Sequence, residues 1–214
     1  MRLWGLRLHG RGDNRLYTVA RWFAVPLFCG VYGMRLRGGH HLPRYGPAIV
    51  IMNHKANIDP VVAGAICDRP LRFMAKKELF ANKYLRRLIT HLGAFPIDRG
   101  SGDREALRTS MEILSAGQLL LMFPEGHRQR DLAVHEFMPG VALIALRSGA
   151  PVIPLAVDGT QRMVRDGKLR HAQWAAAMGP AVDFSDLSGR NSKTYAVAAE
   201  RMHAAVAELY ATLL

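Results

Sequence analysis

The sequence predicts an α/β fold in which a mixed, largely parallel sheet is flanked by helices. Short apolar runs rich in branched residues alternate with segments whose apolar residues recur at helical spacing. This alternation is typical of parallel sheets with helical crossovers. Half of the 214 residues are hydrophobic, so the chain can form one domain with a full core. Disordered and fibrous classes do not fit this composition.

Strands and helices can be placed in order along the chain. Strands are predicted at residues 48–52, 71–75, 94–97, 119–123 and 152–157, with a sixth near 173–178. Helices are predicted at residues 59–67, 76–92, 103–116, 141–148 and 192–214. Asp59 and Pro60 favour a helix start, because Asp is a preferred N-cap residue and Pro suits the first helical position. Gly117 and Gly149 are each predicted to end a helix.

A basic and apolar segment precedes these elements. Arginines flank the stretch from Leu16 to Met34 on both sides, and Arg21 and Pro26 interrupt it. A spanning helix needs roughly 20 mostly apolar residues, so the stretch favours an interfacial helix in the headgroup region. An amphipathic helix packed on the domain is the alternative. We therefore expect an N-terminal membrane-interface segment over residues 1–40 and a catalytic domain over residues 41–214.

The charge balance narrows the possible partners. Lys and Arg outnumber Asp and Glu by 29 to 17, which gives a net charge of +12. Such an excess attracts nucleic acid, anionic lipid headgroups or phosphorylated substrates. No nucleic acid is expected as a partner, because the chain has no recognition motif and its basic residues are not gathered on one helix face. Two cysteines, Cys29 and Cys67, favour a reducing, intracellular setting.

Chemically versatile residues follow four of the predicted strands. They are, in chain order, His54, Lys76, Arg99 and Glu125. In parallel sheets the ligand site lies beyond the carboxyl ends of the strands. We therefore expect these four side chains to rise from one edge of the sheet.

His54 and Asp59 are candidates for a catalytic pair. Histidine accepts a proton near neutral pH, and it does so best when a carboxylate holds its other ring nitrogen. The alternatives are a plain helix N-cap for Asp59 and a surface loop histidine for His54. No Ser or Cys lies in a nucleophile-elbow context, so a substrate hydroxyl can serve as the nucleophile.

The residues after the third and fourth strands are candidates for substrate binding. Arg99 could hold a phosphate through two parallel hydrogen bonds, or pair with a neighbouring aspartate. Glu125 could brace Arg99 or accept a hydrogen bond from a glycerol hydroxyl. Gly126 permits close backbone approach, and Arg128 adds a positive charge. A β-turn with solvated charges is the alternative for residues 123–128.

In combination these segments resemble the glycerolipid acyltransferase family, whose best-known members are 1-acylglycerol-3-phosphate (lysophosphatidate) acyltransferases. Its motifs Asn-His-x-Ser-x-x-Asp, Gly-x-Ile/Phe-Pro-Val/Ile-Asp-Arg, Phe-Pro-Glu-Gly-Thr-Arg and Val-Ile-Pro-Leu correspond to residues 53–59, 93–99, 123–128 and 152–155. Shorter similarities lie at residues 75–79 and 137–140. Ala56 stands where the family usually has Ser, and His127 where it usually has Thr. Both departures bear on the identity of the acceptor more than on the reaction.

The resemblance implies a glycerol-3-phosphate acyltransferase-like fold and an O-acyltransferase of phospholipid biosynthesis. A fatty acyl group would pass from acyl-CoA or acyl-ACP, the thioesters of coenzyme A and acyl carrier protein, to 1-acyl-sn-glycerol-3-phosphate, giving phosphatidate. The catalytic residues implied are His54 and Asp59, and the substrate-binding residues are Arg99, Glu125, Gly126, Lys76 and Arg128.

No bound cofactor and no metal are implied, because the acyl thioester is a co-substrate. The implied partners are a lysophospholipid acceptor and an anionic phospholipid surface. The expected location is the cytoplasmic face of the cell membrane, as a peripheral or monotopic protein. Two alternatives stay open: an acyltransferase acting on another lysolipid or an amino-acid lipid, and a non-catalytic anionic-lipid-binding protein.

Overall fold

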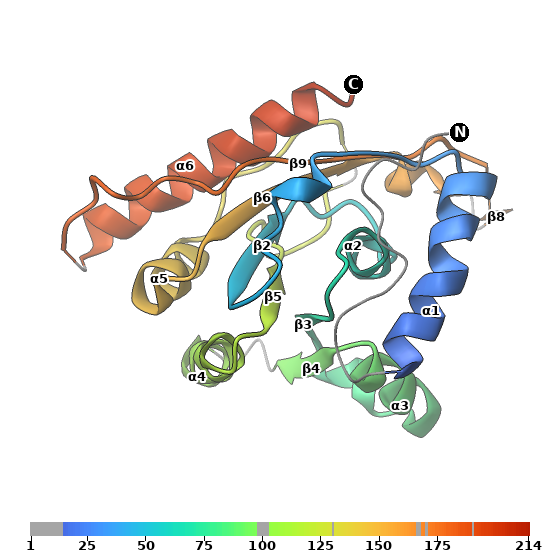
Figure 1. Cartoon of the computed structure of the whole chain (residues 1–214), viewed down its shortest axis with the longest axis horizontal. Coiled ribbons are helices and arrows are strands. Elements are labelled where there is room, and N and C mark those ends of the chain that lie inside the picture. The colour runs from blue at the N-terminus through green and yellow to red at the C-terminus, as the bar shows by residue number, and fades with distance from the viewer. Residues whose placement is uncertain (1–14, 98–102, 130, 166–167, 170, 190) are drawn as a thin grey trace.

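A mixed sheet forms the centre of the molecule, and helices cover both of its faces (Figure 1). The computed structural model describes residues 15–97, 103–129, 131–165, 168–169, 171–189 and 191–214. Within them, seven strands form one sheet in the order β1-β9-β6-β2-β5-β3-β4. The strands are β1 (Arg35–Arg37), β2 (Ala48–Met52), β3 (Leu71–Lys76), β4 (Ala94–Ile97), β5 (Leu119–Met122), β6 (Val152–Asp158) and β9 (Ala175–Met178).

Five neighbouring strands run parallel, and two at one edge run the other way. β6, β2, β5, β3 and β4 are mutually parallel, β9 is antiparallel to β6, and β1 is parallel to β9. The carboxyl ends of β2, β3, β4, β5 and β6 therefore meet at one edge of the sheet. The predicted mixed, largely parallel sheet is confirmed.

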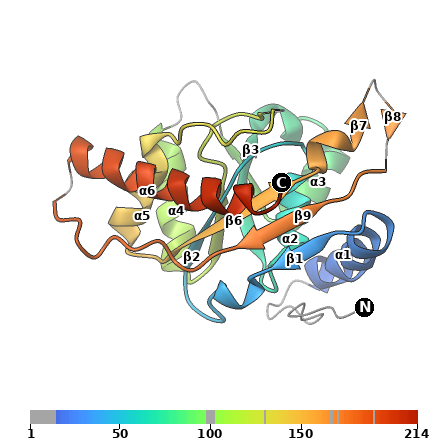
Figure 2. The same cartoon turned by 90° about the horizontal axis from the view of Figure 1, so that it is seen from above.

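Two layers of helices bury the two faces of this sheet. One layer holds α1 (Arg15–Pro26), the π-helix η1 (Leu27–Val31), α2 (Asp59–Ile66) and α3 (Lys83–His91). The other holds α4 (Asp103–Ser115), α5 (Pro139–Ser148) and α6 (Ser192–Ala211). Figure 2 shows α6 running along β6, and β1 leading from α1 into the sheet. Short 3-10 helices lie at η2 (Gly39–His41), η3 (Lys77–Phe80) and η4 (Thr160–Arg162), and β7 (Val164–Arg165) pairs with β8 (Lys168–Leu169).

The alternating side chains of β2 explain why both layers are needed. Val50 and Met52 pack in the core under α1 and α2. Ile49 and Ile51 point the other way, into the core under α4, α5 and α6. Every residue of β2 is fully buried, as expected for a strand covered on both faces. The continuous apolar run therefore identifies the central strand.

The six predicted strands are present. The structure departs from prediction at β1, at the short pair β7 and β8, which was not predicted, and at the helix expected over residues 76–92. β1 was not predicted, since three residues with the sequence Arg-Leu-Arg carry no strand signal. The single helix predicted at residues 76–92 is wrong in its first part. β3 continues through Lys76, η3 follows, and α3 begins only at Lys83 because the Asn82 side chain accepts hydrogen bonds from the backbone N–H groups of Tyr84 (3.0 Å) and Leu85 (3.1 Å).

The N-terminal helix α1 packs on α2 with one face and exposes the other. Tyr17 Oη donates to the carbonyls of Gly64 (3.0 Å) and Arg69 (3.1 Å), and Arg21 Nε donates to the carbonyl of Ala65 (3.0 Å). A cation at the C-terminal turn of a helix is favourable, which explains an arginine within an apolar segment. The outer face of α1 carries exposed Val19, Trp22 and Phe23, and η1, which continues α1, exposes Leu27 and Val31. Among the described residues, no helix is both long enough and apolar enough to cross a membrane.

Candidate active site

The loop after β2 carries the central residues of the site. Asn53 holds the start of this loop against β6, because its side-chain amide donates to the Val157 carbonyl (2.9 Å) and its Oδ1 accepts from the Val157 N–H (2.8 Å). His54 follows, and the His54 carbonyl accepts a hydrogen bond from the backbone N–H of Gln129 (2.8 Å). The histidine backbone is thereby fixed to the segment after β5.

His54 and Asp59 are in direct contact. His54 Nδ1 lies 2.9 Å from Asp59 Oδ2, and an ionised carboxylate can only accept, so Nδ1 carries the hydrogen. The Asp59 side chain is fully buried, whereas 17% of the His54 side chain is exposed. The imidazole also stacks on Phe123, with ring centroids 4.1 Å apart. With Nδ1 occupied, Nε2 is the nitrogen that can accept a proton from a substrate.

The Asp59 carboxylate does not cap helix α2. Its Oδ2 instead accepts from the backbone N–H groups of Lys55 (2.6 Å) and Ala56 (2.7 Å), which lie before the helix. The N-cap position belongs to Ile58, which has no side-chain cap. The N-cap role considered for Asp59 is therefore wrong. The carboxylate closes the loop on itself and presents the same oxygen to the imidazole.

Thr160 holds the second oxygen of Asp59 and was missed by the sequence analysis. Its Oγ1 donates to Asp59 Oδ1 at 2.7 Å, and the residue is buried. Thr160 follows β6, where Gly159 has a φ of +94° and a Cβ would lie 2.1 Å from the Gln173 carbonyl oxygen. A polar residue just after a Gly at a parallel strand end was the available signal. Together, the contacts of Asp59 with His54, the N–H groups of residues 55 and 56, and Thr160 hold its carboxylate in one orientation.

Glu125 is a buried carboxyl group next to this pair. It follows β5, only 4% of it is exposed, and neither oxygen has a hydrogen-bond partner among the described residues. Burial raises the pKa of Glu125 to about 7. The positive charge of Lys55 and the nearby backbone N–H groups of His54 and His135 oppose this rise, although neither N–H group is in hydrogen-bonding geometry with the carboxyl group. Glu125 is therefore prepared to accept a hydrogen bond from a ligand.

Gly126 forms the turn that carries Glu125. Its φ is +73°, and its N–H donates to the Phe123 carbonyl at 3.0 Å. A Cβ at this position would lie 2.7 Å from Met138 Sδ. The positive φ explains why a glycine occupies this position. The close approach of a ligand to the Gly126 backbone stays a prediction.

Lys55 is buried beside His54 and Asp59, and it holds the loop after β5 in place. Its Nζ donates to the carbonyls of Asp131 (3.0 Å) and Ala133, and it lies 5.0 Å from the ring centroid of Tyr210. Tyr210 Oη in turn donates to Asp158 Oδ1 at 3.1 Å. The loop of His54, the segment after β5 and helix α6 are therefore held together by one buried lysine.

The other predicted binding residues are less closely tied to the pair. Lys76 is the exposed last residue of β3, whose carboxyl end lies at the same edge of the sheet. Arg128 is exposed in the segment after β5. Arg99 lies outside the described residues. The structure thus brings His54, Asp59, Glu125 and Gly126 together around the ends of β2 and β5.

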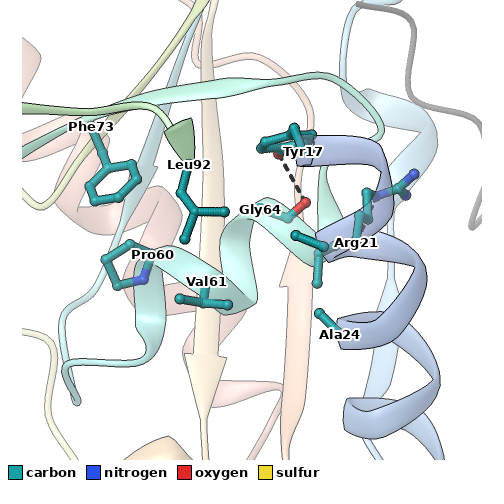
Figure 3. Close-up of a pocket in the computed structure, with 10 residues that line it drawn as sticks. Tyr17, Arg21, Ala24, Pro60, Val61, Gly64, Phe73 and Leu92 are labelled. Carbon is teal, nitrogen blue, oxygen red and sulfur yellow. Dashed lines mark hydrogen bonds between the residues drawn. The ribbon is translucent and has the colours of Figure 1, made fainter. Parts of the chain in front are cut away.

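An apolar groove opens beside helix α2, between α1 and the end of α3 (Figure 3). Its lining includes Pro60, which directly follows Asp59, together with Val61 and Gly64 of the same helix. Phe73 and Leu92 form one side, and α1 forms the other through Tyr17, Ala20, Arg21 and Ala24. This groove could not be predicted from local sequence patterns, because its walls come from four separate elements.

The site joins a histidine oriented by a buried carboxylate, at the carboxyl edge of the parallel strands, to an apolar groove that begins at the neighbouring Pro60. A histidine held in this way is suited to accept a proton from a hydroxyl group. A sequence model described as acyltransferase matches residues 33–158, more than half of the chain. The chain belongs to the acyltransferase family, and the resemblance drawn from its motifs is confirmed.

Individual relatives and a solved structure agree with this assignment. The chain is 29% identical to the 1-acyl-sn-glycerol-3-phosphate acyltransferase of Streptococcus pneumoniae over 195 residues, 89% of this chain and 72% of that protein. It is 31% identical to the Escherichia coli enzyme of the same name over 145 residues, 66% of this chain and 59% of that protein. The crystal structure of the 1-acyl-sn-glycerophosphate acyltransferase PlsC from Thermotoga maritima shares the fold, with a TM-score of 0.70, 22% identity and coverage of 90% of this chain and 79% of that one.

Proposed function

We propose that this enzyme transfers a fatty acyl group from an acyl thioester to the free hydroxyl of 1-acyl-sn-glycerol-3-phosphate, giving phosphatidate. The observation that carries the proposal is the 2.9 Å contact between His54 Nδ1 and the buried Asp59 carboxylate. The names of the relatives supply the acceptor. The donor is a thioester of coenzyme A or of acyl carrier protein, and no bound cofactor takes part.

In the proposed reaction His54 Nε2 removes the proton from the acceptor hydroxyl as its oxygen attacks the thioester carbonyl. Asp59 stabilises the imidazolium that forms. The tetrahedral intermediate then expels the thiolate, which receives the proton from His54, so the histidine returns to its starting state. General-base catalysis of this kind contributes about 10²–10⁴ in rate, and positioning of the two substrates supplies much of the rest.

The polar residues around the pair suit a glycerol phosphate headgroup. The Glu125 carboxyl group, which has no hydrogen-bond partner among the described residues, can accept a hydrogen bond from the acceptor. It belongs to the turn formed at Gly126 and is close to the His54 backbone. Arg99, by its position in the family motif, would bind the phosphate, with Lys76 and Arg128 as further cations. The apolar groove beside Pro60 suits an acyl chain.

The exposed face of α1 supports a site at a membrane surface. Trp22 and Phe23 are exposed on α1, which Tyr17 and Arg21 hold to α2, and Leu27 is exposed at the start of η1. Aromatic and apolar side chains on a basic segment favour the headgroup region of an anionic membrane. We place the enzyme on the cytoplasmic face of the cell membrane as a peripheral or monotopic protein.

The proposal is tested with purified protein, lysophosphatidate and acyl-coenzyme A or acyl carrier protein thioesters, with phosphatidate detected by mass spectrometry. The wild type should form phosphatidate, and His54→Ala should abolish its formation without loss of fold. Full activity of His54→Ala would contradict the mechanism.

The acceptor is tested in the same assay. Because Ala56 and His127 depart from the family motifs, other lysophospholipids and amino-acid lipids are offered in parallel. Preferential acylation of one of these would change the acceptor, whereas lipid binding without thiol release would favour a non-catalytic protein. Arg99→Ala should raise the KM for lysophosphatidate before it affects the KM for the thioester.

A further inference from the structure

Helix α3 (Lys83–His91) makes little contact with the rest of the described structure. No residue of α3 is buried, and its apolar side chains Tyr84 (75%), Leu88 (52%) and Leu85 (37%) are exposed. Leu79 in the preceding η3 is 44% exposed. Apolar residues at helical spacing normally mark the face that a helix buries, so this face of α3 lacks the cover that its pattern calls for.

Basic residues form the polar face of α3, opposite and beside the apolar stripe. At 100° per residue, Tyr84, Leu88 and Leu85 fall on one side of the helix, and Lys83, Arg86 and Arg87 fall on the other and at its margins. Residues 76–91 contain five Lys or Arg and one Glu, which gives a net charge of +4 when His91 is counted as neutral. A helix with an apolar stripe and a strongly basic polar face is typical of helices that lie in a membrane interface.

We propose that α3, with η3, is a second membrane-docking surface that lies flat on an anionic bilayer, in addition to α1. Exposed Tyr84 and Leu88 enter the boundary between headgroups and acyl chains, and Arg86 and Arg87 pair with lipid phosphates. Charge complementarity selects this occupant over a second copy of the chain, because two copies would bring the same basic residues together. An acidic protein would satisfy the charges, but it would leave the apolar stripe and the exposed face of α1 unexplained.

The position of α3 fits this role, which deepens the proposed function by adding a lipid contact. Leu92, just past α3, lines the apolar groove opposite Tyr17 and Ala24 of α1 (Figure 3). In Figure 1 the two helices lie at the same end of the molecule, away from α4 and α5. A bilayer in contact with both helices therefore covers the groove between them, where a lipid tail can pass without crossing water.

Vesicle binding tests the charges first. Each basic residue near an anionic surface contributes about 1 kcal/mol, so Arg86→Gln/Arg87→Gln should bind mixed phosphatidylcholine–phosphatidylglycerol vesicles about 30-fold more weakly than the wild type. The matched control is Arg104→Gln/Arg147→Gln, two exposed arginines on α4 and α5, which should bind within about twofold of the wild type because they lie at the far end of the molecule. Equal weakening in both double variants would overturn the proposal, because it would reduce the effect to net charge.

The apolar stripe is tested separately. Tyr84→Gln/Leu88→Gln removes no buried contact, so circular dichroism and Tm should stay close to the wild type, while vesicle binding falls about tenfold or more. Leu214→Gln, at the exposed C-terminus, is the control and should bind as the wild type. Unchanged vesicle binding in the α3 variant would overturn the docking role. Loss of binding to acidic carrier protein without loss of vesicle binding would overturn it in favour of a protein contact.

Turnover separates this inference from the proposed function. With a short-chain, water-soluble lysophosphatidate the α3 variants should keep the kcat of the wild type, and with a long-chain acceptor in vesicles their rate should fall together with binding. If the wild type transfers no acyl group while the α3 variants lose vesicle binding, the proposed function fails and the docking surface stands. If all proteins turn over vesicle substrate equally, the docking surface fails alone.

Discussion

The charge of Asp59 can be removed without removing its shape, because the structure dictates how an amide would sit there. In Asp59→Asn the oxygen of the amide must replace Oδ2, since the N–H groups of Lys55 (2.6 Å) and Ala56 (2.7 Å) both point at that atom. The NH₂ group then faces Thr160, whose hydroxyl can rotate and accept instead of donate. The His54 Nδ1–H keeps an acceptor, so the tautomer needed for catalysis is retained.

What the substitution removes is the attraction between the carboxylate and the imidazolium formed during the reaction. At the 2.9 Å separation of Nδ1 and Oδ2, two unit charges interact by about 6 kcal/mol at an effective dielectric constant near 20. The loop N–H groups and Thr160 share this charge, so the net loss is smaller. We expect kcat to fall about 10²–10⁴-fold, the range in which general-base catalysis operates.

The assay follows thiol release from acyl-coenzyme A with a chromogenic disulfide, together with denaturant unfolding of both proteins. The KM for the acceptor and the free energy of unfolding should change little, because every hydrogen bond keeps a partner. A kcat within about tenfold of the wild type would refute the assignment of Asp59 as the group that stabilises the imidazolium. A large loss of stability would refute the predicted orientation of the amide.

Two further predictions concern the buried groups around the pair. Thr160→Val leaves Asp59 Oδ1 buried without its hydrogen-bond donor, which should lower the free energy of unfolding by about 1–3 kcal/mol and reduce kcat more than it changes KM. Thr160→Ser should restore both the stability and kcat. An unchanged kcat in Thr160→Val would exclude a positioning role for Thr160. For Glu125, the pKa of about 7 lies above its ordinary value of 4.5, so the folded state binds the proton more tightly than the unfolded state. The free energy of unfolding therefore falls by about 3 kcal/mol in all as the pH rises from below 4.5 to above 7. Glu125→Gln should remove this pH dependence, as unfolding titrations at about pH 5 and about pH 8 would reveal, and an identical dependence in wild type and variant would contradict the assigned burial cost.

Local patterns predict most of the elements because the parallel strands are short, largely apolar runs. β2, β3, β4, β5 and β6 each coincide with such a run to within one or two residues. The strands at the antiparallel edge are harder, since β1 is Arg-Leu-Arg and β9 is Ala-Ala-Ala-Met. Their strand state is determined by pairing with each other and with β6, partners far away in the sequence.

The same distinction separates the predicted part of the site from the part that was missed. The contact between His54 and Asp59 is local, and the alternation of strands and helices places both at a strand end. Thr160 contacts Asp59 although the two residues are 101 positions apart in the sequence. The sequence of residues 53–59 does not indicate which distant residue Asp59 contacts. In the sequence Lys55 looks like a solvated loop lysine. Its burial depends on distant partners: the carbonyls of residues 131 and 133, the Asp131 carboxylate and the ring of Tyr210.

The two faces of the sheet are covered differently, and this difference explains why some helices expose apolar side chains at helical spacing. On the side of α4, α5 and α6 the helices cover a continuous apolar core. Helix α6 also contributes Tyr210, which together with Lys55 and Asp158 stabilises the loop that carries His54. On the side of α1 and α3 apolar side chains remain exposed around a groove that reaches Pro60. An acyltransferase needs both, because proton transfer requires a rigid base and a lipid substrate requires an apolar approach to it. The exposed stripes of α1 and α3 are apolar surfaces that the other described residues do not cover, and the proposed docking on a bilayer would bury both.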